Sequence, residues 1–297
     1  MRIIACVVAF SVAACTAEQH APAALAEGFD GANYATPAAQ VAHGERLARI
    51  FMCAGCHGPD YTGVNFGEMI PIVQGLWATN ISLTMPAMSD AQLETLLRKG
   101  VHPAREIYLM PSKQTQFLGE RDMSALIAHL RSIPPAGTAT PPPPPGFEQA
   151  VAARLPDDYW RWQDYPGHPR TYHNSEEEAD YFARHRAPHA GIGANAVQGR
   201  YIAITVCSGC HGAALDGRGE DAGGIQAALR YDDAEYERLL TQSTSRDGRK
   251  LVMEWGFGHE VFPLTASERS AVIGYTRELA RVRAVGPQGA RASGESR

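Results

Sequence analysis

Apolar residues recur at helical spacing in two stretches of the chain, and each stretch leads into a pair of cysteines. The first stretch follows Gly44 and the second follows Gly199. Apolar side chains three and four positions apart line one face of an α-helix. Thr36-Pro37 precedes the first stretch and supplies an N-cap and a proline at the first helical position. The pattern predicts one helix ahead of each cysteine pair.

Two further helices are predicted after each cysteine pair. Ser89 and Asp232 each stand three positions before a glutamine or glutamate, which is the spacing of a capping box. Leucines follow at helical spacing in both places, and Gly100 ends the first of these helices. A last helix is predicted over residues 120–131 in the first half and 265–281 in the second. The repeated order of elements predicts an all-α protein built from two similar units.

Composition indicates a soluble globular chain. Its 297 residues are 44% hydrophobic and 20% charged, which is typical of folded proteins and sufficient for two domains. The formal net charge is -5, whereas nucleic-acid binding requires a basic face. We therefore expect no nucleic-acid partner.

The N-terminus has the form of an export signal. One arginine precedes an apolar run over residues 3–14 that is too short to span a bilayer. The sequence VAAC at residues 12–15 resembles the lipobox of bacterial lipoproteins, in which the cysteine is acylated. By this resemblance residues 1–26 are a signal and tether, and a lipid on Cys15 holds the protein to a membrane in the periplasm or cell envelope. The alternative is ordinary cleavage after Ala26, which would release a soluble protein.

Four of the six cysteines lie outside the signal and form two C-x-x-C pairs. Each pair is followed at once by histidine, in CAGCH at residues 53–57 and CSGCH at residues 207–211. C-x-x-C-H is the attachment pattern for c-type haem, because two thiols add to the vinyl groups and the histidine then reaches the iron. We predict two covalently bound haem c groups, held by Cys53, Cys56, His57, Cys207, Cys210 and His211. The alternatives are a thioredoxin-like redox pair, which would not need histidine twice, and part of a four-ligand zinc site.

Each half resembles a class I cytochrome c module, in which the first and last helices cross and the haem lies in the crevice. The resemblance covers roughly residues 40–135 and 195–283. With GVHP at residues 100–103 and LRSIPP at 130–135, the first half is similar to modules of the cytochrome subunits of bacterial membrane-bound dehydrogenases. Those subunits usually carry three such modules, whereas two are found in this chain. The resemblance implies electron transfer by tandem cytochrome c domains.

The predicted domains are residues 36–135 and 151–283. Between them, residues 136–150 are predicted to be a linker, since five consecutive prolines favour an extended polyproline II conformation. Residues 155–189 form an aromatic and charged insert in the second domain, which we expect to pack on a module surface. The insert could instead dock a partner or supply a haem ligand from His168, His173, His185 or His189. Residues 284–297 are predicted to be a disordered tail.

The sixth ligand of each iron is predicted to be methionine. Class I modules place this methionine between the second and last helices, and the resemblance therefore selects Met110 in the first half, with His102 as runner-up. The remaining candidates there are Met69, Met85 and Met88. In the second half Met253 is the only methionine after Met123, and it holds the corresponding place. A thioether suits iron in an electron-transfer site, and His259 is the competitor of Met253.

A haem with both axial positions filled passes electrons but has no open position for a substrate. We therefore expect an exported diheme electron carrier rather than an enzyme. It would act between a dehydrogenase or quinol-oxidising complex and a terminal acceptor, with redox proteins as partners and no small-molecule substrate. The alternatives are a diheme enzyme of the peroxidase or thiosulfate-oxidising type, and a permanent cytochrome subunit of an oxidoreductase complex.

If Cys15 is acylated, the mature protein will partition into detergent, and Cys15→Ser will move it to the soluble fraction or block its processing. Detergent phase separation measures the partitioning, and the mass of the N-terminal peptide shows whether Cys15 is acylated. A mature N-terminus at Glu27 would contradict the lipid tether. The haem content should not change, because all four predicted haem cysteines lie downstream.

Overall fold

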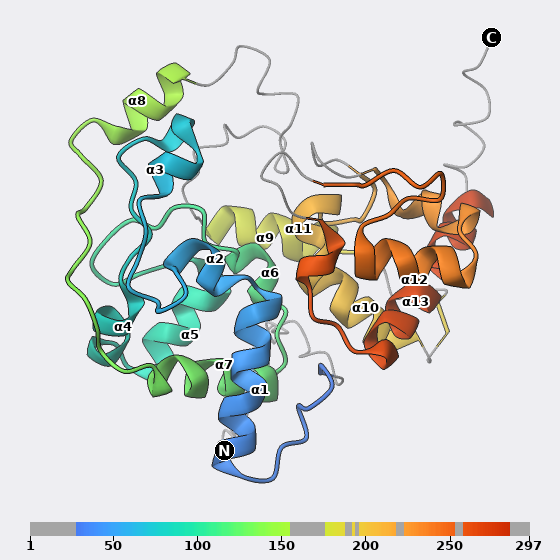
Figure 1. The fold of residues 1–297 in the computed structure, drawn as a ribbon, viewed down its shortest axis with the longest axis horizontal. Helices are drawn as coiled ribbons and strands as arrows, with labels where there is room; N and C mark the ends of the chain where they lie inside the picture. Colours follow the sequence, from blue (N-terminus) through green and yellow to red (C-terminus); the bar gives the residue numbers. More distant parts are fainter. Residues whose placement is uncertain are drawn as a thin grey trace, which may run out of the picture.

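The computed structural model describes residues 28–154, 176–187, 192–193, 196–217, 223–252 and 258–285. In this part of the chain the secondary structure is helical, with isolated β-bridges and no β-strand, so the prediction of an all-α protein is confirmed for it. Two groups of helices lie side by side, and α9 lies at their junction (Figure 1). We call residues 28–154 the first half and residues 196–285 the second half.

The helices of the first half are α1 (Pro37–Ile50), α2 (Cys53–His57), α3 (Phe66–Met69), α4 (Ile81–Thr84), α5 (Asp90–Lys99), α6 (Ser112–Thr115), α7 (Glu120–Ser132) and α8 (Phe147–Arg154), with short turns η1 (Pro71–Val73) and η2 (Met85–Ala87). Helix α9 is Glu176–His185. The second half contains α10 (Val197–Ile202), a π-helical turn η5 (Ala203–Cys207), α11 (Ser208–His211), η6 (Ile225–Arg230), α12 (Asp233–Gln242), η7 (His259–Val261) and α13 (Ala266–Val285).

The predicted helix starts are confirmed by side-chain caps. Thr36 accepts a hydrogen bond from the Ala39 amide at 3.2 Å at the start of α1. Ser89 and Asp232 each form a reciprocal capping box, with Gln92 and Glu235 respectively. These caps satisfy amide groups that have no partner within the helix. The starts were predictable because each cap depends on residues three positions apart.

Two glycines allow the first and last helices of each half to cross in close contact. A Cβ atom at Gly44 in α1 would lie 1.9 Å from the backbone oxygen of Ala125 in α7. One at Gly199 in α10 would lie 2.0 Å from the backbone oxygen of Ala271 in α13. No side chain can be placed at these distances, so both positions require glycine. Figure 1 shows α1 beside α7 and α10 beside α13, and the two crossings are equivalent.

Each half departs from regular α-helix just before its cysteine pair. In the first half α1 ends at Ile50, and Met52 adopts a left-handed backbone conformation with a φ of 53° before α2 begins. In the second half the chain stays helical but passes through the π-helical turn η5. The left-handed residue and the π-helical turn both change the direction in which the side chains of the following residues project. The helical spacing of apolar residues reveals neither of them.

A buried carboxylate joins the two halves. Asp122 in α7 is 1% exposed and accepts hydrogen bonds from the Tyr201 hydroxyl in α10 at 2.6 Å and the Phe29 amide at 3.0 Å. Its other oxygen lies 2.6 Å from His43 Nε2 in α1. The Tyr201 oxygen in turn accepts from the Gly119 amide at 3.0 Å. Because a buried carboxylate is costly unless it is fully hydrogen-bonded, these partners hold α1, α7 and α10 together.

A second buried carboxylate also joins the two halves. Glu268 in α13 is fully buried, pairs with Arg46 of α1, and accepts from the Asp30 amide at 2.8 Å. Buried apolar side chains of both halves form one cluster, which includes Leu47 of α1 and Val272 of α13. The two halves therefore share a core.

The segment predicted to be a linker packs along the first half. Asn80 Nδ2 donates hydrogen bonds to the backbone oxygens of Ala136, at 2.8 Å, and Thr138, at 3.0 Å. Phe147 is 5% exposed and belongs to a cluster with Phe66 of α3. The boundary predicted at residue 151 falls inside α8, whose Val151 belongs to the same cluster. The segment is thus part of the first half and packs along its surface.

Several predictions concern residues outside the described part of the chain. They include the signal with Cys15, residues 155–175 of the insert, Met253, and residues 286–297 of the predicted tail. Within the described ranges, no helix is both long enough and apolar enough to cross a membrane.

Substituting Gly44 by alanine should destabilise the protein by about 1–3 kcal/mol, because the added methyl group must displace the backbone of α7. Gly274 in α13 is the matched control, since a Cβ atom there meets nothing within 4 Å. Gly274→Ala should stabilise the protein by about 0.4–1 kcal/mol by restricting the unfolded chain. Denaturant unfolding of both variants measures the difference, and equal effects would contradict the close crossing.

Candidate functional site

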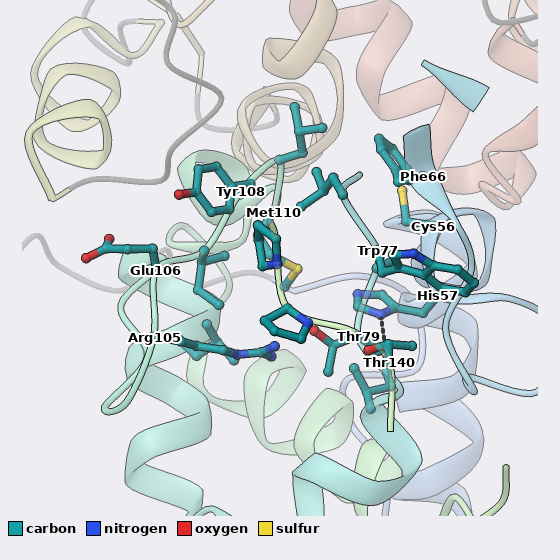
Figure 2. A pocket seen from close by; sticks show the side chains of 18 of the residues that line it. Cys56, His57, Phe66, Trp77, Thr79, Arg105, Glu106, Tyr108, Met110 and Thr140 are labelled. Carbon is teal, nitrogen blue, oxygen red and sulfur yellow. Dashed lines mark hydrogen bonds between the residues drawn. The ribbon is translucent and has the colours of Figure 1, made fainter. Parts of the chain in front are cut away.

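A cavity of about 560 Å³ lies in the first half, within the size range of cofactor sites. Its lining includes Cys53, Cys56 and His57 of α2, and Met110 from the loop between α5 and α6. Most of the remaining wall is apolar and includes Phe66, Leu76, Trp77, Leu93, Leu126 and Leu130. Figure 2 shows the His57 ring and the Met110 sulfur both directed into the cavity. The residues present therefore fit a covalently attached haem with two axial ligands.

A backbone carbonyl fixes the ring of His57. His57 Nδ1 lies 2.7 Å from the Thr79 oxygen (Figure 2, dashed line). Because a carbonyl can only accept, Nδ1 carries the proton and the lone pair of Nε2 stays available for a metal. Burial also lowers the pKa of His57, which favours the neutral ring. His57 is thus held in the tautomer that binds iron.

The cysteines of the two pairs form no disulfide with one another. Burial raises the pKa of Cys53 and of Cys207 to about 12, and the second cysteine of each pair adds to the effect. A protonated thiol is a poor nucleophile and a poor metal ligand. In the described ranges, no three His, Cys, Asp or Glu side chains are grouped to hold a metal ion.

Met110 lines the cavity, whereas its runner-up His102 does not. The backbone of Leu109 has a φ of 60°, a left-handed conformation that is uncommon for a branched residue. The chain turns sharply there, and the Met110 side chain follows into the cavity. His102 Nδ1 instead accepts a hydrogen bond from the Ala104 amide at 3.1 Å.

The other methionine candidates of the first half are less well placed. Met69 is 57% exposed, and Met88 is buried outside the cavity lining. Met85 does border the cavity, but it is 5% exposed and packs in the apolar core shared by the two halves. Met110 is therefore the methionine best placed to reach an iron opposite His57.

The proline-rich segment closes one side of the cavity. Pro141–Pro144 and Phe147 belong to its lining. The Tyr108 hydroxyl donates to Glu148 Oε1 at 2.9 Å, and the Tyr108 and Phe147 rings meet edge to face at 5.2 Å. The segment is thus fastened to the loop that carries Met110. A run of prolines predicts an extended chain but gives no signal of the surface against which it packs.

The histidine of the second C-x-x-C-H motif and the glycine after it have the same local geometry as those of the first. His211 Nδ1 lies 2.7 Å from the Gly223 oxygen, which again leaves Nε2 available. The glycine after each histidine has almost the same backbone, with φ and ψ of 81° and 159° at Gly58 and of 80° and 159° at Gly212. Burial lowers the pKa of His211 as it does that of His57. The acceptors Thr79 and Gly223 could not be predicted from the sequence. Every residue has a backbone carbonyl, so the residue type does not indicate which carbonyl the histidine will meet.

His259, at the start of η7, lies opposite His211. The centres of the two rings are 6.2 Å apart, and their planes meet at 27°. His259 Nδ1 is buried without a hydrogen-bond partner among the described residues. Burial, reinforced by His211, lowers the pKa of His259 to about 4, so the ring is neutral at pH 7. Met253 lies outside the described residues and stays a prediction.

One of the four histidines of the insert can be placed. His185 Nδ1 lies 2.8 Å from the Tyr181 oxygen within α9, and the two rings stack at 4.0 Å. His168, His173 and His189 lie outside the described residues.

Residues 39–130 match the family described as cytochrome c oxidase, cbb3-type, subunit III. The matched range contains the first C-x-x-C-H motif, Thr79 and Met110, and it ends in α7. No curated protein matches the chain. The matched part is similar to a cytochrome c domain, which carries covalently bound haem c and transfers electrons.

Proposed function

We propose that this chain, a c-type cytochrome over residues 39–130, is a diheme electron carrier built of two tandem cytochrome c domains. One observation carries the proposal: the second half repeats the histidine geometry of the first. In both halves a C-x-x-C-H histidine donates from Nδ1 to a carbonyl at 2.7 Å. In both, the helix before the motif crosses the last helix at a glycine. A zinc site or a redox pair requires neither feature.

In the first site, Cys53 and Cys56 would hold the haem as thioethers, and His57 Nε2 and Met110 would bind the iron. The haem supplies reversible one-electron chemistry when it is bound. Thr79 fixes the ring of His57, and the apolar walls and the proline-rich segment limit the access of water. Both factors act on the reduction potential of a haem.

Met110 supports a carrier over an enzyme. A thioether on the side opposite His57 fills the position at which a peroxidase or thiosulfate-oxidising cytochrome would bind its substrate. We therefore propose redox proteins as partners, either as successive partners of a mobile carrier or, as the second candidate, in a permanent complex. Export to the periplasm or cell envelope and the lipid on Cys15 rest on the sequence of residues 1–26.

The full chain should carry two haems, and Cys207→Ala combined with Cys210→Ala should leave one. Haem is counted per chain by the pyridine haemochrome spectrum and by intact mass after acid-acetone extraction, which covalent haem resists. The matched control, Cys53→Ala with Cys56→Ala, should remove the other haem. A single haem in the wild-type chain, or bound zinc, would disprove the diheme proposal.

Met110→Ala should abolish the far-red charge-transfer band that a thioether gives with ferric haem, and should lower the potential of the first haem. Met85→Leu is the matched control, since Met85 borders the same cavity and leucine conserves its volume. It should leave both properties unchanged. Optical redox titration of the variants measures them. An unaltered first-haem spectrum in Met110→Ala would exclude Met110 as the ligand.

A further inference from the structure

We infer that His259, rather than Met253, is the sixth ligand of the iron in the second haem site, so that this haem is held between two histidines. The inference rests on the proposed function, because it requires a haem at Cys207 and Cys210. It names a ligand that differs in chemistry from the methionine expected from the module order.

The separation of the two rings carries the inference. An imidazole nitrogen bound to a first-row metal ion lies about 2 Å from the ion. The same nitrogen lies about 1.1 Å from the centre of its ring, given ring bonds of about 1.35 Å. Two imidazoles on opposite sides of one iron therefore have centres about 6 Å apart. The observed separation between His211 and His259 is 6.2 Å.

The hydrogen bonds of both rings agree with this role. The bond from His211 Nδ1 to the Gly223 oxygen leaves the other nitrogen of His211 free to bind. The His259 ring has a buried nitrogen, Nδ1, that no described group satisfies. A buried polar atom without a partner is rare in folded proteins, and a nitrogen that binds a metal ion is one explanation for it.

Packing of the preceding residue fixes the position of His259. A Cβ atom at Gly258 would lie 2.3 Å from Ser243 Oγ and 2.5 Å from the Leu251 oxygen. Ser243 is the left-handed C-cap of α12, and its hydroxyl accepts a hydrogen bond from the Glu260 amide at 3.3 Å. The residues on both sides of His259 are thus fastened to the end of α12. These contacts hold the backbone on both sides of His259, whose ring centre lies 6.2 Å from that of His211.

The angle between the rings predicts a spectroscopic signature. Planes that meet at 27° are closer to parallel than to perpendicular. Nearly parallel imidazoles give low-spin ferric haem a rhombic EPR spectrum, whereas perpendicular rings give one very anisotropic signal. The oxidised full chain should therefore show a rhombic bis-histidine signal from the second haem, in addition to the signal of the first haem.

Three variants of the full chain test the assignment. His259→Ala should abolish the rhombic signal, convert the second haem to high spin, and regain low spin when imidazole is added. His259→Met should add a second thioether charge-transfer band and raise the midpoint potential of the second haem. The matched control, Met253→Leu, should change neither the EPR signal nor the potential. If His259→Ala fails to fold, His259→Met and Met253→Leu decide the question.

Haem counting separates the failure of this inference from that of the proposed function. Two haems with an unchanged second-haem spectrum in His259→Ala would overturn the assignment of His259 and leave the diheme carrier in place. Loss of a thioether charge-transfer band of the second haem in Met253→Leu would also overturn the assignment of His259 and leave the diheme carrier in place. A single haem in the wild-type chain would instead disprove the proposed function.

Discussion

The crossing of two helices at a glycine is the constraint on which the rest of each half depends. At Gly44 and Gly199 the backbone of one helix rests directly on the backbone of the last helix, and no side chain separates them. The first cysteine of each pair lies within nine residues of the glycine. Its position relative to α7 or α13 is therefore set by the crossing, and the histidine that ends the motif meets a loop carbonyl at the same distance in both halves.

The shared core adds a second constraint, because the halves cannot shift independently. Asp122 lies in α7 of the first half. It accepts a hydrogen bond from the hydroxyl of Tyr201, which follows Gly199 by two residues in the second half. Removing one partner would leave a buried polar group unsatisfied, which typically costs about 1–3 kcal/mol. The two crossings are thus coupled through one carboxylate, and the two candidate haem sites are held in a fixed relation.

Features that depend on neighbouring residues could be predicted from the sequence. The capping boxes at Ser89 and Asp232 and the two C-x-x-C-H motifs are of this kind. Long-range features could not be predicted: Phe147 packs against Phe66, and Asp122 meets Tyr201. The order of elements selected Met110, and the structure places it in the lining of the cavity that also contains His57. In the second half the order of elements favoured Met253 over His259, and Met253 stays a prediction. The order of elements could not reveal that the ring centre of His259 lies 6.2 Å from that of His211, because this separation depends on long-range packing.

The loop that carries Met110 also touches the second cysteine motif. Helix α6 follows Met110 directly, and its Gln114 donates from Nε2 to the Val206 oxygen at 3.0 Å. A Cβ atom at Gly209 would lie 2.3 Å from the same Nε2, so the side chain of Gln114 rests on the C-x-x-C turn itself. Met110, the proposed sixth ligand of the first iron, is thus connected to Val206, the residue before Cys207. The connection consists of the four peptide units from Met110 to Gln114, the Gln114 side chain and one hydrogen bond. If a thioether holds the first iron and two imidazoles hold the second, the first haem has the higher potential. Electron transfer from the second haem to the first is then the thermodynamically favourable direction.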